Sequence, residues 1–291
     1  MTTLDLPKLI LDYLGEQGRN RTRIGEAAVS LSASGSCSRQ VSYLRHKPEL
    51  AEPVEAKAMA RFELGHAVHA AVASILGQSK LKIVGVEEAV WISLASHPGR
   101  TIPGHVDMVV EHEGKRIPIE VKSCGAWEWK VVAGLKVPSD TAEGNISWAH
   151  GAQNLSYQRA LGGGAGGGAG AERGYMLYWC VEKDKEAEQH PTFPFFAVEV
   201  PFEERGMGAG RAPLESRARL HAGKPAGSPV PADRGNGTIQ KSGRWVLPFP
   251  CNYCAFVKEC WPDAAMDPEG PRARTFVVPE PKFKIQKADV F

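Results

Sequence analysis

The stretch that most constrains the fold is residues 104–123, where two runs of alternating apolar residues flank a short polar turn. The apolar positions are Val106, Met108 and Val110 before the turn, and Ile117, Ile119 and Val121 after it. Alternation with a period of two is typical of β-strands, and Glu113-Gly114 between the runs is a turn signal. The sequence therefore predicts a β-hairpin.

Three charged residues of this hairpin form a candidate metal site. Glu120 and Lys122 are two residues apart, so their side chains leave the second strand on the same face, and Asp107 joins them from the first strand. Two carboxylates and the backbone carbonyl of Val121 are hard oxygen ligands that suit Mg²⁺ or Mn²⁺, and Lys122 could orient or deprotonate a water. A half-buried strand with an exposed glutamate and lysine is the plainer explanation of Glu-Val-Lys. The spaced aspartate is what favours a metal site.

Length and composition indicate an ordinary globular protein. The chain has 291 residues, enough for one large domain or two modest ones, and 43% of them are hydrophobic. Thirty-five basic and 33 acidic residues give a net charge of +2, so any attraction to nucleic acid must come from local clusters. No apolar run approaches the roughly 18 residues that span a bilayer, and residues 1–14 lack the pattern of a secretory signal. We expect a cytoplasmic protein with no membrane association.

The cysteines point to a second metal site. Disulfides are rare in the cytoplasm, whereas clustered thiolates bind zinc or iron-sulfur clusters. The late group comprises Cys251, Cys254 and Cys260. A fourth ligand has to come from elsewhere, and Cys124 and Cys180 are more simply explained as small buried residues. Cys37 is the best remaining candidate, and it would tie the two ends of the chain together.

Periodicity and turn signals predict the remaining elements. Helices are expected at 3–17, 56–77, 145–161 and 203–222, strands at 81–94, 175–181 and 195–200, a glycine-alanine connector at 162–170, and a long loop at 223–244. The helix at 56–77 should be well buried, and it carries His66 and His69. Because histidines on apolar helices are more often packed than bound to metal, this helix alone does not establish a ligand.

The order of these motifs resembles the RecB-like branch of the PD-(D/E)xK nucleases. The matching motifs are Gly65 with His69, Gly104 with Asp107, Glu120 with Lys122, Gln153 with Tyr157, and one early plus three late cysteines. The resemblance extends over residues 37–260. It is most specific to the iron-sulfur members, namely the CRISPR-associated exonucleases called Cas four and the AddB-type nuclease domains.

The resemblance implies a fold and a division of the chain. The fold is α/β, with a restriction-endonuclease-like core in which helices flank a mixed central sheet, and with N- and C-terminal segments joined by an iron-sulfur cluster. The expected parts are an N-terminal helical segment at 1–55, the nuclease core at 56–202, a helix, loop and cysteine cluster at 203–265, and a tail at 266–291.

The resemblance also implies roles for particular residues. The Mg²⁺ or Mn²⁺ ligands would be His69, Asp107, Glu120 and the carbonyl of Val121. Lys122 would be the catalytic lysine, and Gln153 and Tyr157 would contact DNA or support the site. A [4Fe-4S] cluster would be bound by Cys37, Cys251, Cys254 and Cys260.

The function implied is that of a metal-dependent deoxyribonuclease. It would hydrolyse phosphodiester bonds as an exonuclease on single-stranded DNA, in recombination, repair or CRISPR adaptation, with proteins of those processes as partners. The sequence leaves a homo-oligomer open. The alternative function is a non-catalytic iron-sulfur module that binds DNA and recruits a partner, and a zinc-clasped α/β protein is a third interpretation.

Overall fold

The structure is a computed structural model, and the residues that it describes form two compact units. The described residues are 5–20, 30–35, 40–41, 43–44, 47–93, 101–136, 148–162, 171–202, 238–239, 245–247, 251, 253–268 and 275–278. The first unit comprises Met1–Ala28, Ser36–Ala56 and Gly223–Phe291. The second comprises Val29–Gly35 and Lys57–Ala222. Each unit is described by itself.

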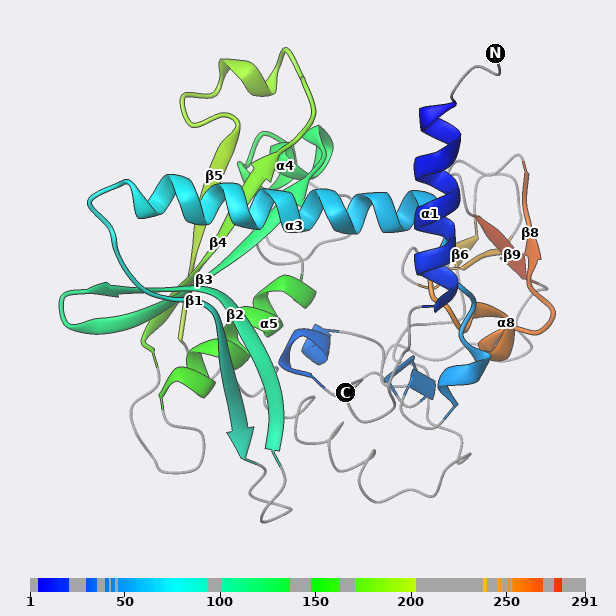
Figure 1. The fold of residues 1–291 in the computed structure, drawn as a ribbon, viewed down its shortest axis with the longest axis horizontal. Helices are drawn as coiled ribbons and strands as arrows, with labels where there is room; N and C mark the ends of the chain where they lie inside the picture. Colours follow the sequence, from blue (N-terminus) through cyan, green and yellow to red (C-terminus); the bar gives the residue numbers. More distant parts are fainter. Residues whose placement is uncertain are drawn as a thin grey trace. The chain divides into compact units, whose positions relative to one another are not determined.

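The second unit is built on a five-stranded mixed sheet in the order β1-β2-β3-β4-β5 (Figure 1). Its strands are β1 (Lys82–Ser93), β2 (Thr101–His112), β3 (Lys115–Cys124), β4 (Arg173–Cys180) and β5 (Phe195–Pro201). Its helices are α3 (Ala56–Gly77, whose first residue belongs to the other unit), α4 (Ala126–Val132) and α5 (Trp148–Leu161), with short 3-10 turns η2 (Leu31–Gly35) and η4 (Ala187–Gln189).

The strand pairing confirms the predicted hairpin. β2 and β3 pair antiparallel from His112↔Lys115 to Met108↔Ile119, around a turn in which Glu113 and Gly114 both have positive φ. β3 then pairs parallel with β4, a connection that needs a crossover and here carries α4 and α5. β4 and β5 occupy the two predicted strand segments and pair antiparallel.

Helices pack on both faces of the sheet. Val68 and Val72 of α3 pack with Met108, Val110 and residues of β3, whereas Tyr157 and Ala160 of α5 pack with Val90, Val106 and their neighbours. The predicted bounds of α3 are confirmed, but the expectation of a well-buried helix is wrong. Only Met59, Val68 and Val72 are buried on it, because one stripe of an α-helix faces a sheet. Phe62, Leu64 and Ile75 are each more than 40% exposed.

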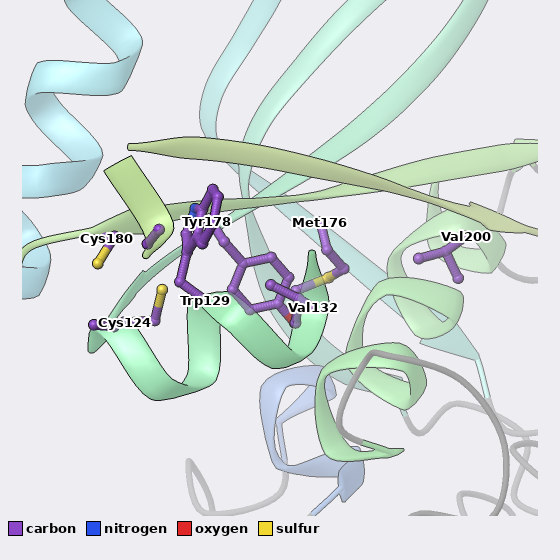
Figure 2. Packing of buried hydrophobic residues seen from close by; sticks show 9 residues of the cluster. Cys124, Trp129, Val132, Met176, Tyr178, Cys180 and Val200 are labelled. Atoms are coloured by element: carbon purple, nitrogen blue, oxygen red, sulfur yellow. The ribbon is translucent and has the colours of Figure 1, made fainter. Parts of the chain in front are cut away.

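A third apolar cluster joins α4 to β4 and β5 (Figure 2). Trp129 is fully buried at its centre and meets Phe193 edge-on, with ring centroids 5.2 Å apart. Cys124 and Cys180 lie in the same cluster as buried thiols, at paired positions of β3 and β4. The prediction that these two cysteines are small buried residues is therefore confirmed. Trp127, two residues before Trp129, is exposed.

The first unit carries helix α1 (Leu6–Asn20), turn η3 (Pro48–Leu50), helix α8 (Val257–Cys260) and a small second sheet. This sheet has the order β6-β7-β9-β8, from β6 (Thr238–Ile239), β7 (Trp245–Val246), β8 (Ala265–Met266) and β9 (Phe276–Val278). Leu247, Val257 and Phe276 form its buried core. β6 corrects the expectation that 223–244 is loop throughout.

Several sequence predictions fall partly or wholly outside the described residues. These are the helix at 203–222, most of the glycine-alanine connector at 162–170, most of the loop at 223–244, most of the tail at 266–291, and Cys37. Among the described helices, none is both long enough and apolar enough to cross a membrane.

Candidate metal centre

The candidate centre lies where β2 and β3 separate. Their ladder ends at Met108↔Ile119, and the next residues along are Asp107 and Glu120. Here a side chain replaces the backbone carbonyl as hydrogen-bond acceptor, because Asp107 Oδ2 accepts a hydrogen bond from the Val121 N–H at 2.7 Å. Both acids are therefore buried just beyond the end of the ladder, and Glu120 is only 2% exposed.

Glu120, Lys122 and Gln153 form a closed polar triangle. Lys122 Nζ donates to Glu120 Oε1 at 2.6 Å and to Gln153 Oε1 at 3.2 Å. Gln153 Nε2 donates to the same Glu120 oxygen at 2.7 Å and lies 3.0 Å from the Tyr157 hydroxyl. The sequence-predicted motifs Glu-x-Lys and Gln-x3-Tyr therefore meet, with α5 holding the glutamine and tyrosine against β3.

Close packing explains why a glycine stands three residues before Asp107. A Cβ added to Gly104 would lie 2.8 Å from Leu31 Cβ and 3.0 Å from Tyr157 Cε1. Because real Cβ atoms do not approach that closely, any other residue would displace η2 or the tyrosine ring. Gly104 thus leaves room for Leu31 and the Tyr157 ring to pack against β2.

α3 brings His69 to the other side of Asp107. His69 Nδ1 lies 3.5 Å from Asp107 Oδ1 and 3.9 Å from Glu87 Oε1 of β1. Among the described residues, these three side chains form the one group of at least three histidine, cysteine or acidic residues whose ligand atoms all lie within 4.8 Å. His66 instead lies near Glu63 on the exposed side of the helix.

One buried oxygen in this centre is left without a hydrogen bond. Glu120 Oε1 accepts two hydrogen bonds, but Oε2 is buried and has no partner among the described residues. An unsatisfied buried polar group costs about 1–3 kcal/mol, and more when it is charged. A carboxylate oxygen in this position fits a divalent cation, because Mg²⁺ and Mn²⁺ take oxygen ligands.

The electrostatics agree with that fit. Burial raises the pKa of Glu120 to about 8, against the charge of Lys122, and neighbouring Asp107 raises it further. Burial also raises the pKa of Asp107, while His69 and the Val121 N–H lower it. Two carboxyl groups that resist ionisation together are stabilised as carboxylates by a bound cation.

His150, Tyr178 and Glu128 form a second set of polar side chains near Lys122, which the sequence analysis did not predict. His150 Nδ1 is 3.0 Å from the Tyr178 hydroxyl and 4.0 Å from Glu128 Oε1. Burial and the charge of Lys122 lower the pKa of His150 to about 4, and burial raises the pKa of Glu128. His150 and Glu128 therefore lie close enough to Lys122 for its charge to act on both. No pattern in the sequence connected them to it.

The late cysteines lie in the first unit, on and just before α8. Backbone hydrogen bonds from Cys254 to Cys251 and from Cys260 to Phe256 wind this segment into short turns. Two contacts connect it to the segment that follows Cys37 in the sequence. Tyr43 stacks on Phe256 with ring centroids 5.2 Å apart, and the Glu52 N–H donates to the Ala255 carbonyl at 2.8 Å.

Comparison with known proteins gives distant structural similarity only. No family model matches the sequence, and no curated protein matches it. Among solved structures, the chain is similar to SSO0001, with 17% identity, a TM-score of 0.46, and coverage of 88% of this chain and 96% of that chain. It is also similar to an alkaline exonuclease (LHK-Exo) from Laribacter hongkongensis, with 11% identity, a TM-score of 0.41, and coverage of 72% and 92%. The same exonuclease in complex with dAMP gives 13% identity, a TM-score of 0.41, and coverage of 71% and 92%. Similarities this distant assign no function, which has to be argued from the chemistry of the site.

Proposed function

We propose that the chain is a Mg²⁺- or Mn²⁺-dependent deoxyribonuclease whose active site is the centre on β2 and β3. The observation that carries the proposal is the buried Glu120 carboxylate, with one oxygen bound to Lys122 and Gln153 and the other buried without a hydrogen bond among the described residues. This combination of a cation ligand with an adjacent lysine suits phosphodiester hydrolysis. The ligands would be Asp107, Glu120, His69 and the Val121 carbonyl.

Each residue of the centre has a distinct role in the proposed hydrolysis. A divalent cation held there supplies charge that polarises the phosphate and lowers the pKa of an attacking water. Lys122, fixed by Glu120 and Gln153, orients the water and opposes negative charge that builds on the phosphate. Tyr157 and Gln153 keep the lysine in position through their own hydrogen bond.

The narrower assignment is to an exonuclease acting on single-stranded DNA, in recombination, repair or CRISPR adaptation. It rests on the order of sequence motifs, from Gly65 to Tyr157, and not on a distance in the structure. The proposal includes a [4Fe-4S] cluster bound by Cys37, Cys251, Cys254 and Cys260, because four thiolates are the usual ligand set of such a cluster. The contacts of Tyr43 with Phe256 and of Glu52 with Ala255 support the early cysteine as the fourth ligand.

End-labelled DNA tests the proposal directly. Single- and double-stranded substrates, with each end open or blocked, are incubated with Mn²⁺ and wild-type protein, Lys122→Met or Lys115→Met. Lys115 is a matched control on the same strand, exposed and paired with Glu172. We expect nucleotides to be released from open single-stranded ends by wild type and Lys115→Met, and not by Lys122→Met. Full activity of Lys122→Met would overturn the catalytic assignment, and DNA binding without any cleavage would favour the non-catalytic module.

A further inference from the structure

Glu87 is a third acidic residue at the centre, and the motif pattern of the sequence does not include it. Val86 pairs with Met108 and Glu88 pairs with Val106, so Glu87 and Asp107 lie between the same two paired positions of β1 and β2. Side chains at opposite positions of neighbouring strands are close enough to act together. Glu87 Oε1 accordingly lies 3.9 Å from His69 Nδ1, on the side of the histidine that also faces Asp107.

The backbone is distorted at this pair of residues. Glu87 has φ of 48°, in the left-handed region that residues other than glycine seldom adopt. On the opposite strand the alternation of faces breaks at Asp107: Val106 packs in the cluster of α5, whereas Met108, two residues on, packs in that of α3. A regular strand would place both on one face. The two irregularities, the left-handed φ of Glu87 and the break in side-chain alternation at Asp107, therefore occur at the same level of the sheet.

The neighbouring acid shows that the position of Glu87 is not general to this strand. Glu88 forms an ion pair with Arg116 across the sheet, which is an ordinary role for an acid on a strand. The contacts of Glu87 run instead to His69 and Asp107. Two consecutive glutamates thus differ in their surroundings, and only one of them faces the centre.

A separate observation is an unsatisfied oxygen in the same centre. Glu120 Oε2 is buried without a hydrogen bond among the described residues, while Lys122 is bound to the other oxygen of this carboxylate. On the β1 side, the ligand atoms of Glu87, Asp107 and His69 all lie within 4.8 Å of one another. A cation is the group that satisfies carboxylate oxygens gathered in this way.

We infer that Glu87 is a ligand of the divalent cation, binding it together with His69 and Asp107 on the β1 side of the centre. This inference rests on the proposed function, since it assigns another ligand to the same site. One imidazole nitrogen among carboxylates also favours Mn²⁺ over Mg²⁺, because Mg²⁺ prefers oxygen ligands and lies below Mn²⁺ in affinity for nitrogen donors.

Binding of Mn²⁺ alone, without DNA, tests the inference. The full chain is titrated with Mn²⁺, and free Mn²⁺ is measured by its electron paramagnetic resonance signal, for wild type, Glu87→Gln, Glu88→Gln and Asp107→Asn. Loss of an outer-shell partner costs about 10- to 100-fold in metal affinity, so loss of a direct ligand should cost at least about tenfold. We expect that loss in Glu87→Gln and Asp107→Asn, and affinity close to that of wild type in Glu88→Gln.

A glycine variant separates ligand loss from misfolding. Glu87→Gly removes the carboxylate and relieves the left-handed backbone, so the protein should unfold at a temperature no lower than wild type while binding Mn²⁺ as weakly as Glu87→Gln. Unchanged Mn²⁺ affinity in both Glu87 variants, alongside weakened binding in Asp107→Asn, would overturn the inference and leave the proposed function standing. A wild-type protein that binds no Mn²⁺ would overturn both.

Discussion

The carboxylate of Asp107 accepts a hydrogen bond from the backbone N–H of Val121, just beyond the last paired positions of β2 and β3, which are Met108 and Ile119. A side chain thus replaces a backbone partner at the point where the strands diverge. The same carboxylate faces His69 through its other oxygen. Asp107 therefore pairs β2 with β3, and the proposed function gives it a second, separable role as a ligand of the cation.

Asp107→Asn separates these roles. The amide oxygen can still accept a hydrogen bond from the Val121 N–H. The free energy of unfolding should therefore remain within about 1 kcal/mol of that of wild type. The charge that binds the cation is gone, and Mn²⁺-dependent nuclease activity should fall by at least about 100-fold. Urea unfolding and release of end label measure the two effects. Glu111→Gln is the control, because Glu111 lies on the same strand in an exposed ion pair with Lys82. Activity of Asp107→Asn within a few-fold of wild type would contradict the assignment of Asp107 as a ligand.

The position of Gln153 between Lys122, Glu120 and Tyr157 predicts a graded response to mutation. Gln153→Leu removes all three hydrogen bonds and should destabilise the protein by about 1–3 kcal/mol, since buried partners lose their acceptor or donor. Tyr157→Phe removes one bond and should cost about 0.5–1.5 kcal/mol. Activity should follow the same order, because Lys122 loses a partner only in the first variant. Equal losses in the two variants would show that Gln153 does not position the lysine.

Local rules predicted which of these residues share a strand or helix face, whereas the resemblance to a nuclease family is what grouped them in one site. Period-two alternation put Glu120 and Lys122 on one face, the Glu113-Gly114 turn brought Asp107 alongside, and the spacing of four put Gln153 and Tyr157 on one side of a helix. Each of these relationships spans fewer than 20 residues. The structure confirms the hairpin and the bounds of α3.

Glu87, His150 and the second sheet were missed for a different reason. Glu87 reaches the centre through a left-handed φ and through pairing with a strand about 20 residues away, and neither follows from the composition of β1. The one available signal was a pair of adjacent glutamates interrupting an apolar strand. His150 meets Tyr178 across the crossover connection. β6, β7 and β8 are two residues long, too short for alternation to identify them.

The raised pKa of Glu120 predicts how the stability of the metal-free protein depends on pH. The folded protein holds the Glu120 proton up to about pH 8, whereas the unfolded chain releases it near the ordinary value of 4.5. The folded state therefore binds more protons between these values, and the free energy of unfolding falls as pH rises through this window. The slope from this one group is at most about 1.4 kcal/mol per pH unit.

The difference between wild type and Glu120→Gln isolates Glu120 from His150 over the interval from pH 6.5 to pH 8. With a folded pKa of about 4, His150 is neutral there, whereas the unfolded imidazole is half protonated at pH 6.5 and loses its charge by pH 8, a contribution that is the same in both proteins. Urea unfolding in EDTA should thus give lower stability at pH 8 than at pH 6.5 for wild type, and a smaller decrease for Glu120→Gln. Saturating Mn²⁺ should remove the decrease, because the cation binds the ionised carboxylate. Identical slopes for wild type and Glu120→Gln would mean that Glu120 titrates normally.

Removal of one thiolate from the first unit should release iron and leave Mn²⁺ binding at the centre on β2 and β3 unchanged. Protein purified without oxygen should contain about four iron atoms per chain and show the visible absorption of a [4Fe-4S] cluster. Cys254→Ser should lose most of both, and the segment around α8 should become more sensitive to protease, because binding of a metal cofactor and folding of its ligand segment are coupled. The packing of Tyr43 on Phe256 would be lost with it.

Cys180→Ala is the matched control for this cysteine variant. Cys180 is buried in the apolar cluster with Trp129, and its thiol donates to the Glu182 carbonyl at 3.3 Å. Cys180→Ala should therefore lower the free energy of unfolding and leave the iron content unchanged. Mn²⁺ affinity measured by paramagnetic resonance should be equal in both variants, since their ligands to Mn²⁺ are intact. A colourless wild-type protein loaded with zinc would contradict the cluster and favour a structural zinc site at the same cysteines.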